Sequence, residues 1–170
     1  MSVTLILGGA RSGKSKRAED LAKASEKKVV YIATSPNMDD EEWRLRVEHH
    51  KQQRPSTWQT VEEELLLSET IQQQGDVCII VDCLTLWLSN VMYAGLDIEK
   101  NTQDLCDALQ SSACEVIIVS NEVGMGLVPE SQLGRAFRDA QGRLNQAVAD
   151  VANHVEFVVA GLPLLIKGKG

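Results

Sequence analysis

The sequence predicts a single α/β domain, in which helices cover both faces of a mostly parallel central sheet that ends in an antiparallel edge hairpin. Two observations predict this three-layer sandwich. Apolar runs of strand length alternate with segments of helical periodicity, and a glycine-rich turn joins the first strand to the first helix. The 170 residues suffice for one such core and are too few for two. We therefore expect one domain over residues 1–170.

The composition is that of an ordinary globular protein, with 44% hydrophobic and 24% charged residues. No apolar run is long enough for a signal peptide or a membrane span, so we expect a cytoplasmic protein without a transmembrane segment. The net charge of −7 argues against nucleic acid as a partner, because binding its backbone requires a basic face. The cysteines form no C-x-x-C pair, and we expect them to be reduced and buried.

Residues 8–15, which read GGARSGKS, fit the phosphate-binding pattern G-x-x-x-x-G-K-[ST] at every fixed position. The apolar strand 3–7 precedes them and a helix follows, which favours a P-loop over a glycine-rich turn that precedes a lysine by chance. Glycines let the backbone N–H groups face a polyphosphate, and the start of the helix adds its positive dipole end. Lys14, expected to be solvated, would reach the β- and γ-phosphates, and the Ser15 hydroxyl would bind Mg²⁺. The predicted sandwich is therefore P-loop NTPase-like.

Residues 29–33 are the second predicted strand, and a right-handed crossover makes it parallel to the first. A helix is expected over residues 39–53, and it carries Arg46, His49 and His50. From spacing alone, the adjacent histidines are either one packed and one solvated imidazole or a functional pair.

Thr60 as an N-cap and Glu63 three residues later predict a helix that continues through Ile71 and ends at Gly75, which gives Glu63 a structural role. Residues 77–82 then form a buried strand that ends in Asp82. P-loop proteins place an acid beside the Mg²⁺ shell in this way, so Asp82 is the expected partner of Ser15. Asp82 could instead cap the helix that follows, and the two roles can coexist.

The rest of the chain continues the alternation, with a polar helix over 98–111, a strand over 115–120 and a hairpin of 155–160 with 164–167. The loop 121–129 is either a wall of the site or a passive connection. One face of the long helix after it is expected to pack on the sheet, and it consists of Leu133, Phe137, Ala140, Leu144, Ala147, Val148 and Val151.

Several stretches together resemble one family, the bifunctional adenosylcobinamide kinase and adenosylcobinamide-phosphate guanylyltransferase of cobalamin biosynthesis. The resemblance spans nearly the whole chain, and its most specific part is the loop NEVGMGLVP at residues 121–129. The other stretches that carry it are GGARSGKS at 8–15, YIAT at 31–34, Arg46 with His49 and His50, WQT at 58–60, DCLT at 82–85, FRD at 137–139 and GRLNQ at 142–146.

The resemblance implies two reactions. Adenosylcobinamide is first phosphorylated with ATP or GTP, and GMP then passes from GTP through a guanylylated histidine to give adenosylcobinamide-GDP. The histidine at the matching position is His49, which with Lys14 would be catalytic, while Ser15 and Asp82 would hold Mg²⁺. The implied nucleotide-binding residues are Gly8, Gly9, Ala10, Arg11, Ser12, Gly13, Lys14, Ser15, Ala33, Thr34, Ser35, Arg46, His50, Lys51, Gln52, Gln53, Glu62 and Asp82.

The family also implies a corrinoid partner and a homo-oligomer, as a trimer.

Two other interpretations stay open at this point. A plain P-loop small-molecule kinase needs only residues 8–15 and Asp82 and forms no covalent nucleotide adduct. A nucleotide-dependent switch of the Ras type would be expected to carry D-x-x-G and N-K-x-D, whereas this chain has DCLT at 82–85 and NEVG at 121–124.

Overall fold

The computed structural model describes residues 2–36 and 55–168. Its strands form a seven-stranded sheet in the order β3-β2-β4-β5-β1-β6-β7. Neighbouring strands are parallel, except that β7 is antiparallel to β6 at the edge. The strands are β1 (Ser2–Gly8), β2 (Val29–Ala33), β3 (Gln59–Glu62), β4 (Cys78–Asp82), β5 (Glu115–Asn121), β6 (His154–Val159) and β7 (Leu162–Lys167).

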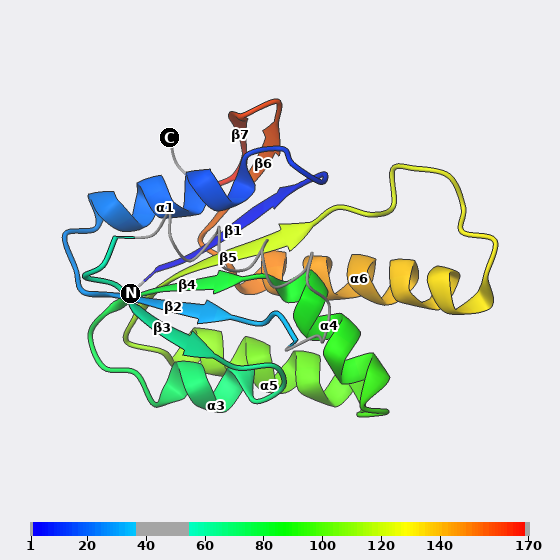
Figure 1. Ribbon diagram of the computed structural model, residues 1–170, viewed down its shortest axis with the longest axis horizontal. Coiled ribbons are helices and arrows are strands. Elements are labelled where there is room, and N and C mark those ends of the chain that lie inside the picture. Colours follow the sequence, from blue (N-terminus) through cyan, green and yellow to red (C-terminus); the bar gives the residue numbers. More distant parts are fainter. Residues whose placement is uncertain (1, 37–54, 169–170) are drawn as a thin grey trace.

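Helices cover both faces of the sheet (Figure 1). Helix α1 (Lys14–Ala24) lies on one face, and the opposite face carries α3 (Leu67–Gln72), α4 (Leu84–Tyr93), α5 (Ile98–Ser111) and α6 (Gln132–Val151). The predicted three-layer α/β sandwich with a mostly parallel sheet and an edge hairpin is therefore confirmed. No helix in the described ranges is both long enough and apolar enough to span a membrane.

The core has two parts, one on each face of the sheet. Along β4, Cys78 and Ile80 pack toward Ala18 and Ala22 of α1, whereas Ile79 and Val81 pack into the larger cluster on the other side. Successive side chains of a strand point to opposite faces, so a strand covered on both faces reads as one continuous apolar run. This explains why β1, β2, β4 and β5 stand out in the sequence.

The predicted helix from Thr60 to Ile71 is wrong in its first half. Residues 59–62 instead form β3, which pairs in parallel with β2 and extends the sheet by one strand. Helix α3 begins only at Leu67. The carboxylate of Glu63 accepts hydrogen bonds from the N–H groups of Leu65 and Leu66 at 2.9 and 2.7 Å. The structural role predicted for Glu63 is thus confirmed, but it shapes the turn before α3 rather than the start of a longer helix.

Two further differences concern the end of the chain. Leu133 is 71% exposed, because the first turns of α6 extend beyond the strand ends and the buried residues of this helix begin at Ala140.

The hairpin turn is shorter than predicted, since β7 begins at Leu162. Ala160 and Gly161 both have positive φ, of 52° and 80°. Two such residues form the tight turn whose twist suits a hairpin.

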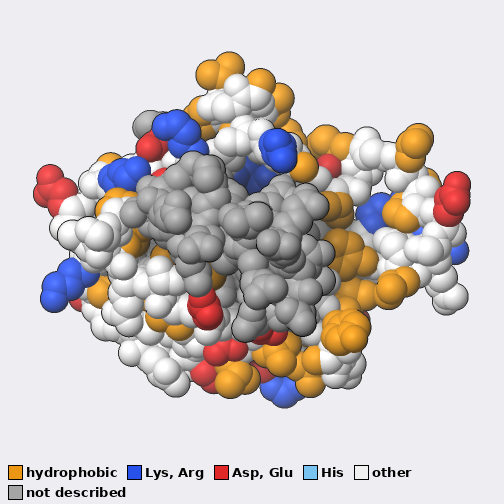
Figure 2. Space-filling model, in the orientation of Figure 1, with side chains coloured by type: hydrophobic (Ala, Val, Ile, Leu, Met, Phe, Trp, Pro, Cys, Tyr) orange, Lys and Arg blue, Asp and Glu red, His pale blue; other side chains and the backbone are white. Residues whose placement is uncertain are grey.

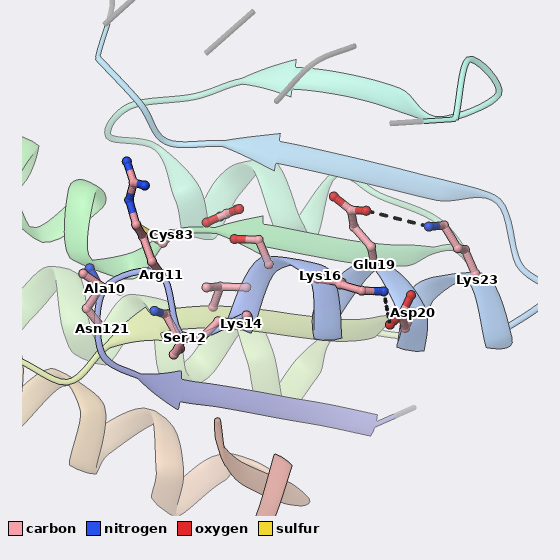
Figure 3. A pocket seen from close by; sticks show the side chains of 14 residues that line it. Ala10, Arg11, Ser12, Lys14, Lys16, Glu19, Asp20, Lys23, Cys83 and Asn121 are labelled. Atoms are coloured by element: carbon pink, nitrogen blue, oxygen red, sulfur yellow. Dashed lines mark hydrogen bonds and ion pairs between the residues drawn. The ribbon is translucent and has the colours of Figure 1, made fainter. Parts of the chain in front are cut away.

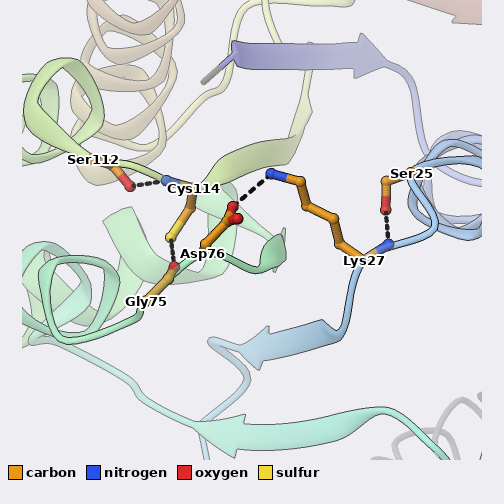
Figure 4. Close-up of polar contacts among 6 residues, drawn as sticks. All are labelled: Ser25, Lys27, Gly75, Asp76, Ser112 and Cys114. Atoms are coloured by element: carbon orange, nitrogen blue, oxygen red, sulfur yellow. Dashed lines mark hydrogen bonds and ion pairs between the residues drawn. The ribbon is translucent and has the colours of Figure 1, made fainter.

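Polar contacts connect the turns that precede β2, β4 and β5 (Figure 4). These turns lie at the N-terminal ends of the strands, and the glycine loop lies at the opposite, C-terminal ends. Lys27 Nζ lies 2.7 Å from Asp76 Oδ1, and the Cys114 thiol donates to the Gly75 carbonyl at 2.8 Å. All four cysteines are free and buried, as predicted: Cys78, Cys83, Cys106 and Cys114. The N-terminal ends of the strands therefore have a structural role, and the groups expected to do chemistry lie at the C-terminal ends.

Candidate active site

The glycine loop joins β1 to α1 and packs against the β6–β7 hairpin. Gly13 is the N-cap of α1 with φ of 99°, and a Cβ there would lie 3.1 Å from Gly161 Cα. A Cβ at Gly8 would lie only 2.5 Å from the Val158 carbonyl oxygen. The N–H of Gly161 donates to the Ser12 carbonyl at 2.8 Å. Both glycines are thus required for the loop to approach the hairpin closely.

Lys14 starts α1 and lines the cleft above the loop, but it is not the solvated residue that the sequence suggested. Only 7% of it is exposed, and its Nζ donates to the Gly9 carbonyl at 2.6 Å. Burial lowers the pKa of the Lys14 ammonium group, while the nearby Cys83 and Asp82 act in the opposite direction. A partly desolvated ammonium group interacts more strongly with an anion than one in water does.

The cleft has a volume of about 590 Å³ and is lined by the glycine loop, α1 and the ends of β4 and β5 (Figure 3). Along α1, Lys16 pairs with Asp20 and Lys23 pairs with Glu19. Arg11 extends from the loop and is exposed. The cleft therefore combines a backbone turn, a helix N-terminus and two cationic side chains of the loop, Arg11 and Lys14, which is the composition of a polyphosphate site.

Asp82 ends β4 and lines the same cleft as Ser15. Its Oδ2 accepts a hydrogen bond from the Tyr31 hydroxyl at 2.6 Å. The N-cap of α4 is Cys83, with no side-chain hydrogen bond, so the structure does not support the alternative in which Asp82 caps that helix. Burial raises the pKa of the Cys83 thiol to about 11, which keeps it neutral at pH 7 beside the carboxylate.

The other predicted nucleotide contacts in the described ranges lie at the ends of adjacent strands. Ala33 pairs with Glu62 on one side and with Asp82 on the other, which brings the ends of β2, β3 and β4 together. Glu62 is exposed, whereas Ala33 and Thr34 are buried. Ser35 follows them and is half-buried. The predicted residues Arg46, His49, His50, Lys51, Gln52 and Gln53 lie outside the described residues.

Thr34 is bonded to the backbone of the next strand's end. Its hydroxyl accepts from the Cys83 N–H at 2.8 Å and lies 2.7 Å from the Cys83 carbonyl oxygen, to which it donates. The Thr34 carbonyl accepts from the Asn90 side chain at 2.9 Å. The threonine thus fixes the chain directly after Asp82.

Replacing Thr34 by valine should lower the free energy of unfolding by about 1–3 kcal/mol, because it leaves the buried N–H of Cys83 without its partner, while the Cys83 carbonyl keeps only the hydrogen bond from the Trp87 N–H. Thr34→Ser keeps the hydroxyl and should cost less. Urea unfolding of both variants measures the difference. If both variants unfold like the wild type, the two hydrogen bonds contribute nothing to stability.

Sequence reasoning assigned no role to the polar residues that support the cleft, although Thr85, Asn121 and Asn145 lie in stretches that carry the family resemblance. Asn121 lines it, and its N–H donates to Thr85 Oγ1 at 2.9 Å while its carbonyl accepts from Asn145 Nδ2 at 3.1 Å. Ser120 donates to Asn145 Oδ1 at 2.7 Å. These contacts join β5, α4 and α6, and they favour the interpretation of residues 121–129 as a wall of the site. The sequence signal that could have found these residues is a polar residue within or next to an apolar run, as at Thr85 and Ser120.

The family model described as cobinamide kinase / cobinamide phosphate guanyltransferase matches residues 4–166. The chain is 44% identical to the bifunctional adenosylcobalamin biosynthesis protein CobP of Pseudomonas aeruginosa, over 97% of each protein. It is also 42% identical to the protein CobU of Escherichia coli, over 96% of this chain and 98% of that protein, which is likewise called a bifunctional adenosylcobalamin biosynthesis protein.

Solved structures with a similar fold include that of the Pyrococcus horikoshii project PH0250, with a TM-score of 0.59 at 10% identity over 99% of this chain and 87% of that one. An ATPase of a bacterial type III secretion system is similar with a TM-score of 0.56 at 11% identity, over 96% of this chain and 56% of that one. At this level of identity, the likeness shows the fold alone.

Proposed function

The chain belongs to the cobinamide kinase / cobinamide phosphate guanyltransferase family, and we propose that its glycine loop serves both reactions of that family. It is a bifunctional enzyme of cobalamin biosynthesis that phosphorylates adenosylcobinamide and then transfers GMP from GTP to the product. The observation that carries the proposed site is the phosphate cradle, in which the glycine loop, the start of α1, Lys14 and Asp82 line one cleft.

In the kinase reaction, the loop N–H groups and Lys14 hold the β- and γ-phosphates. The hydroxyl oxygen of adenosylcobinamide bonds to the γ-phosphorus, the bond from that phosphorus to the bridging oxygen breaks, and the nucleoside diphosphate leaves. Phosphoryl transfer needs positioning and charge stabilisation more than covalent chemistry by the protein. A cationic group held in place before the reaction meets both needs, and Lys14 is held in this way by burial and by the Gly9 carbonyl.

Ser15 and Asp82 fit a magnesium ion. Mg²⁺ prefers hard oxygen ligands and keeps several waters, so one hydroxyl, one carboxylate and the substrate's phosphates suffice for it. Both residues line the same cleft, and only one oxygen of Asp82 accepts a hydrogen bond from Tyr31. A bound Mg²⁺ supplies charge neutralisation on the phosphates. The two residues hold it, and Tyr31 fixes the orientation of the carboxylate.

In the second reaction, His49 is the nucleophile. A neutral imidazole is nucleophilic near pH 7, and its bond to the α-phosphorus of GTP releases pyrophosphate. The phosphate of adenosylcobinamide phosphate then attacks the same phosphorus and frees the histidine. The family resemblance supports this role, with Arg46 and Lys51 neutralising the phosphates. The ends of β2, β3 and β4 at Ala33, Glu62 and Asp82 are adjacent in the sheet, and Asp82 also lines the cradle, so a nucleotide held there would lie near these strand ends.

The experiment that tests the function uses the purified protein with its two substrates in turn. With adenosylcobinamide and γ-labelled ATP or GTP, label should pass to the corrinoid. With adenosylcobinamide phosphate and α-labelled GTP, labelled adenosylcobinamide-GDP should form. Kinase activity without guanylyl transfer would leave a plain small-molecule kinase. The family resemblance also leads us to propose a homotrimer, which light scattering after size-exclusion chromatography tests.

Replacing Asp82 by asparagine should shift the magnesium titration of the kinase reaction to at least tenfold higher concentration, because a neutral amide binds the cation less well than a carboxylate does. Ser15→Ala should shift it in the same direction. Retention of Mg²⁺ with the nucleotide, measured by calorimetry without the corrinoid, provides a second readout. An unchanged titration in both variants would remove these residues from the magnesium shell.

A further inference from the structure

A second cleft, of about 630 Å³, borders the other side of the glycine loop. Its walls are residues 9–12 of that loop, residues 122–126 after β5 and residues 157–160 at the end of β6. Ala10, Arg11 and Ser12 line both clefts. A molecule in the second cleft would therefore lie directly beside phosphates held in the first.

The two clefts differ in chemistry. The first is lined by charged side chains of the loop, α1 and β4, whereas the second is lined mainly by Val123, Met125, Phe157, Val158 and Val159. Met125 is 79% exposed and Val159 is 54% exposed. Figure 2 shows hydrophobic side chains at the surface over the β6–β7 hairpin and along the loop from β5 to α6. Exposed apolar side chains grouped around a cleft indicate a binding site.

The second cleft also has a fixed shape and one carboxylate. The Glu122 N–H donates to the Gly8 carbonyl at 3.0 Å, which fastens the wall to the glycine loop. The Glu122 carboxylate accepts from the N–H groups of Gly124 and Met125 at 2.6 and 3.0 Å. Each carboxylate oxygen can accept more than one hydrogen bond. Glu122 can therefore hold this turn and still bind a donor on a ligand.

We propose that the second cleft binds the corrinoid that accepts the phosphoryl group, an inference that rests on the proposed function. A corrinoid is a large, mostly apolar ring with amide side chains, and one of them ends in the hydroxyl that is phosphorylated. The ring packs against Met125 and Val159, and Glu122 accepts a hydrogen bond from an amide N–H. The hydroxyl then reaches the γ-phosphate across Ala10, Arg11 and Ser12, the residues that the two clefts share.

The test compares Met125→Asp and Val159→Asp with the matched control Leu133→Asp. All three side chains are exposed and apolar, but Leu133 lies on α6 and lines neither cleft. Equilibrium dialysis with adenosylcobinamide measures binding directly through the absorbance of the corrin. We expect the Kd and the KM for adenosylcobinamide to rise at least tenfold in the two cleft variants, with the KM for the nucleotide changed less than twofold. The control and the melting temperatures should match the wild type.

Three outcomes would overturn the assignment. Unchanged corrinoid binding in both cleft variants would exclude the cleft as the acceptor site. A raised KM for the nucleotide, with normal corrinoid binding, would assign the cleft to the nucleoside. An equal loss of binding in the Leu133→Asp control would show a general effect of added charge. Failure of the proposed function looks different, because the wild-type protein itself would then neither bind nor phosphorylate adenosylcobinamide, and the corrinoid assignment would fall with it.

Discussion

Lys14→Ala is expected to reduce both the kinase and the guanylyltransferase rates by roughly a hundredfold. One charge-assisted hydrogen bond to a phosphate contributes up to about 3 kcal/mol, and tenfold in rate corresponds to about 1.4 kcal/mol. Lys14 is partly desolvated and its Nζ is held by the Gly9 carbonyl, so its charge is already in position before the phosphates bind. Initial rates of each reaction, measured at saturating substrate, test this expectation.

Two controls separate loss of the charge from loss of the fold. Lys14→Met keeps most of the buried stem and removes only the ammonium group, so it should be as inactive as Lys14→Ala. Lys27→Ala removes a lysine from the opposite edge of the sheet, where it pairs with Asp76, and should keep wild-type rates. Circular dichroism should show the same secondary structure in all variants. Wild-type turnover by Lys14→Met in either reaction would exclude the lysine from that reaction.

The strands of the sheet could be predicted because burial on both faces produces continuous apolar runs. Strand β2 and helix α5 have the predicted bounds, residues 29–33 and 98–111. Strand β3 could not be predicted in this way, since its residues 59–62 are mostly exposed and show no apolar run. What holds them in the sheet is pairing with β2, a contact between segments far apart in the sequence. The capping pattern of Thr60 and Glu63 did indicate a turn, which Glu63 forms before α3. Pairing with β2, and not this local pattern, determines that residues 59–62 form a strand.

The glycine loop and Asp82 could be predicted because a phosphate cradle needs fixed residue types at fixed spacings. The supporting contacts could not. Tyr31 lies 51 positions before Asp82, and only the pairing of β2 with β4 brings its hydroxyl to the carboxylate. The buried state of Lys14 depends equally on packing around the loop, which no local pattern records. Residues that position a site are thus harder to predict than residues that carry its motif.

His49→Ala is expected to abolish guanylyl transfer while adenosylcobinamide is still phosphorylated. The kinase reaction moves a γ-phosphoryl group directly to the substrate hydroxyl and needs no protein nucleophile. The second reaction, as proposed, forms a phosphorus–nitrogen bond to His49, so removing this imidazole removes the proposed nucleophile. Wild-type protein incubated with α-labelled GTP should therefore carry label that is stable to base and labile to acid. Peptide mapping should place it on His49, and His49→Ala should carry none.

The adjacent histidine provides the matched control. His50→Ala should lower the rate of guanylyl transfer, as the loss of a nucleotide contact would, but it should retain the labelled intermediate. The kinase rate separates a specific effect from misfolding, because a misfolded His49→Ala protein would lose both reactions, whereas loss of the nucleophile removes only one. Label that persists in His49→Ala, or that maps to His50, would overturn the assignment. Since the glycine loop can hold a triphosphate without either histidine, kinase activity would survive that outcome, and the residue that carries the label would be the nucleophile.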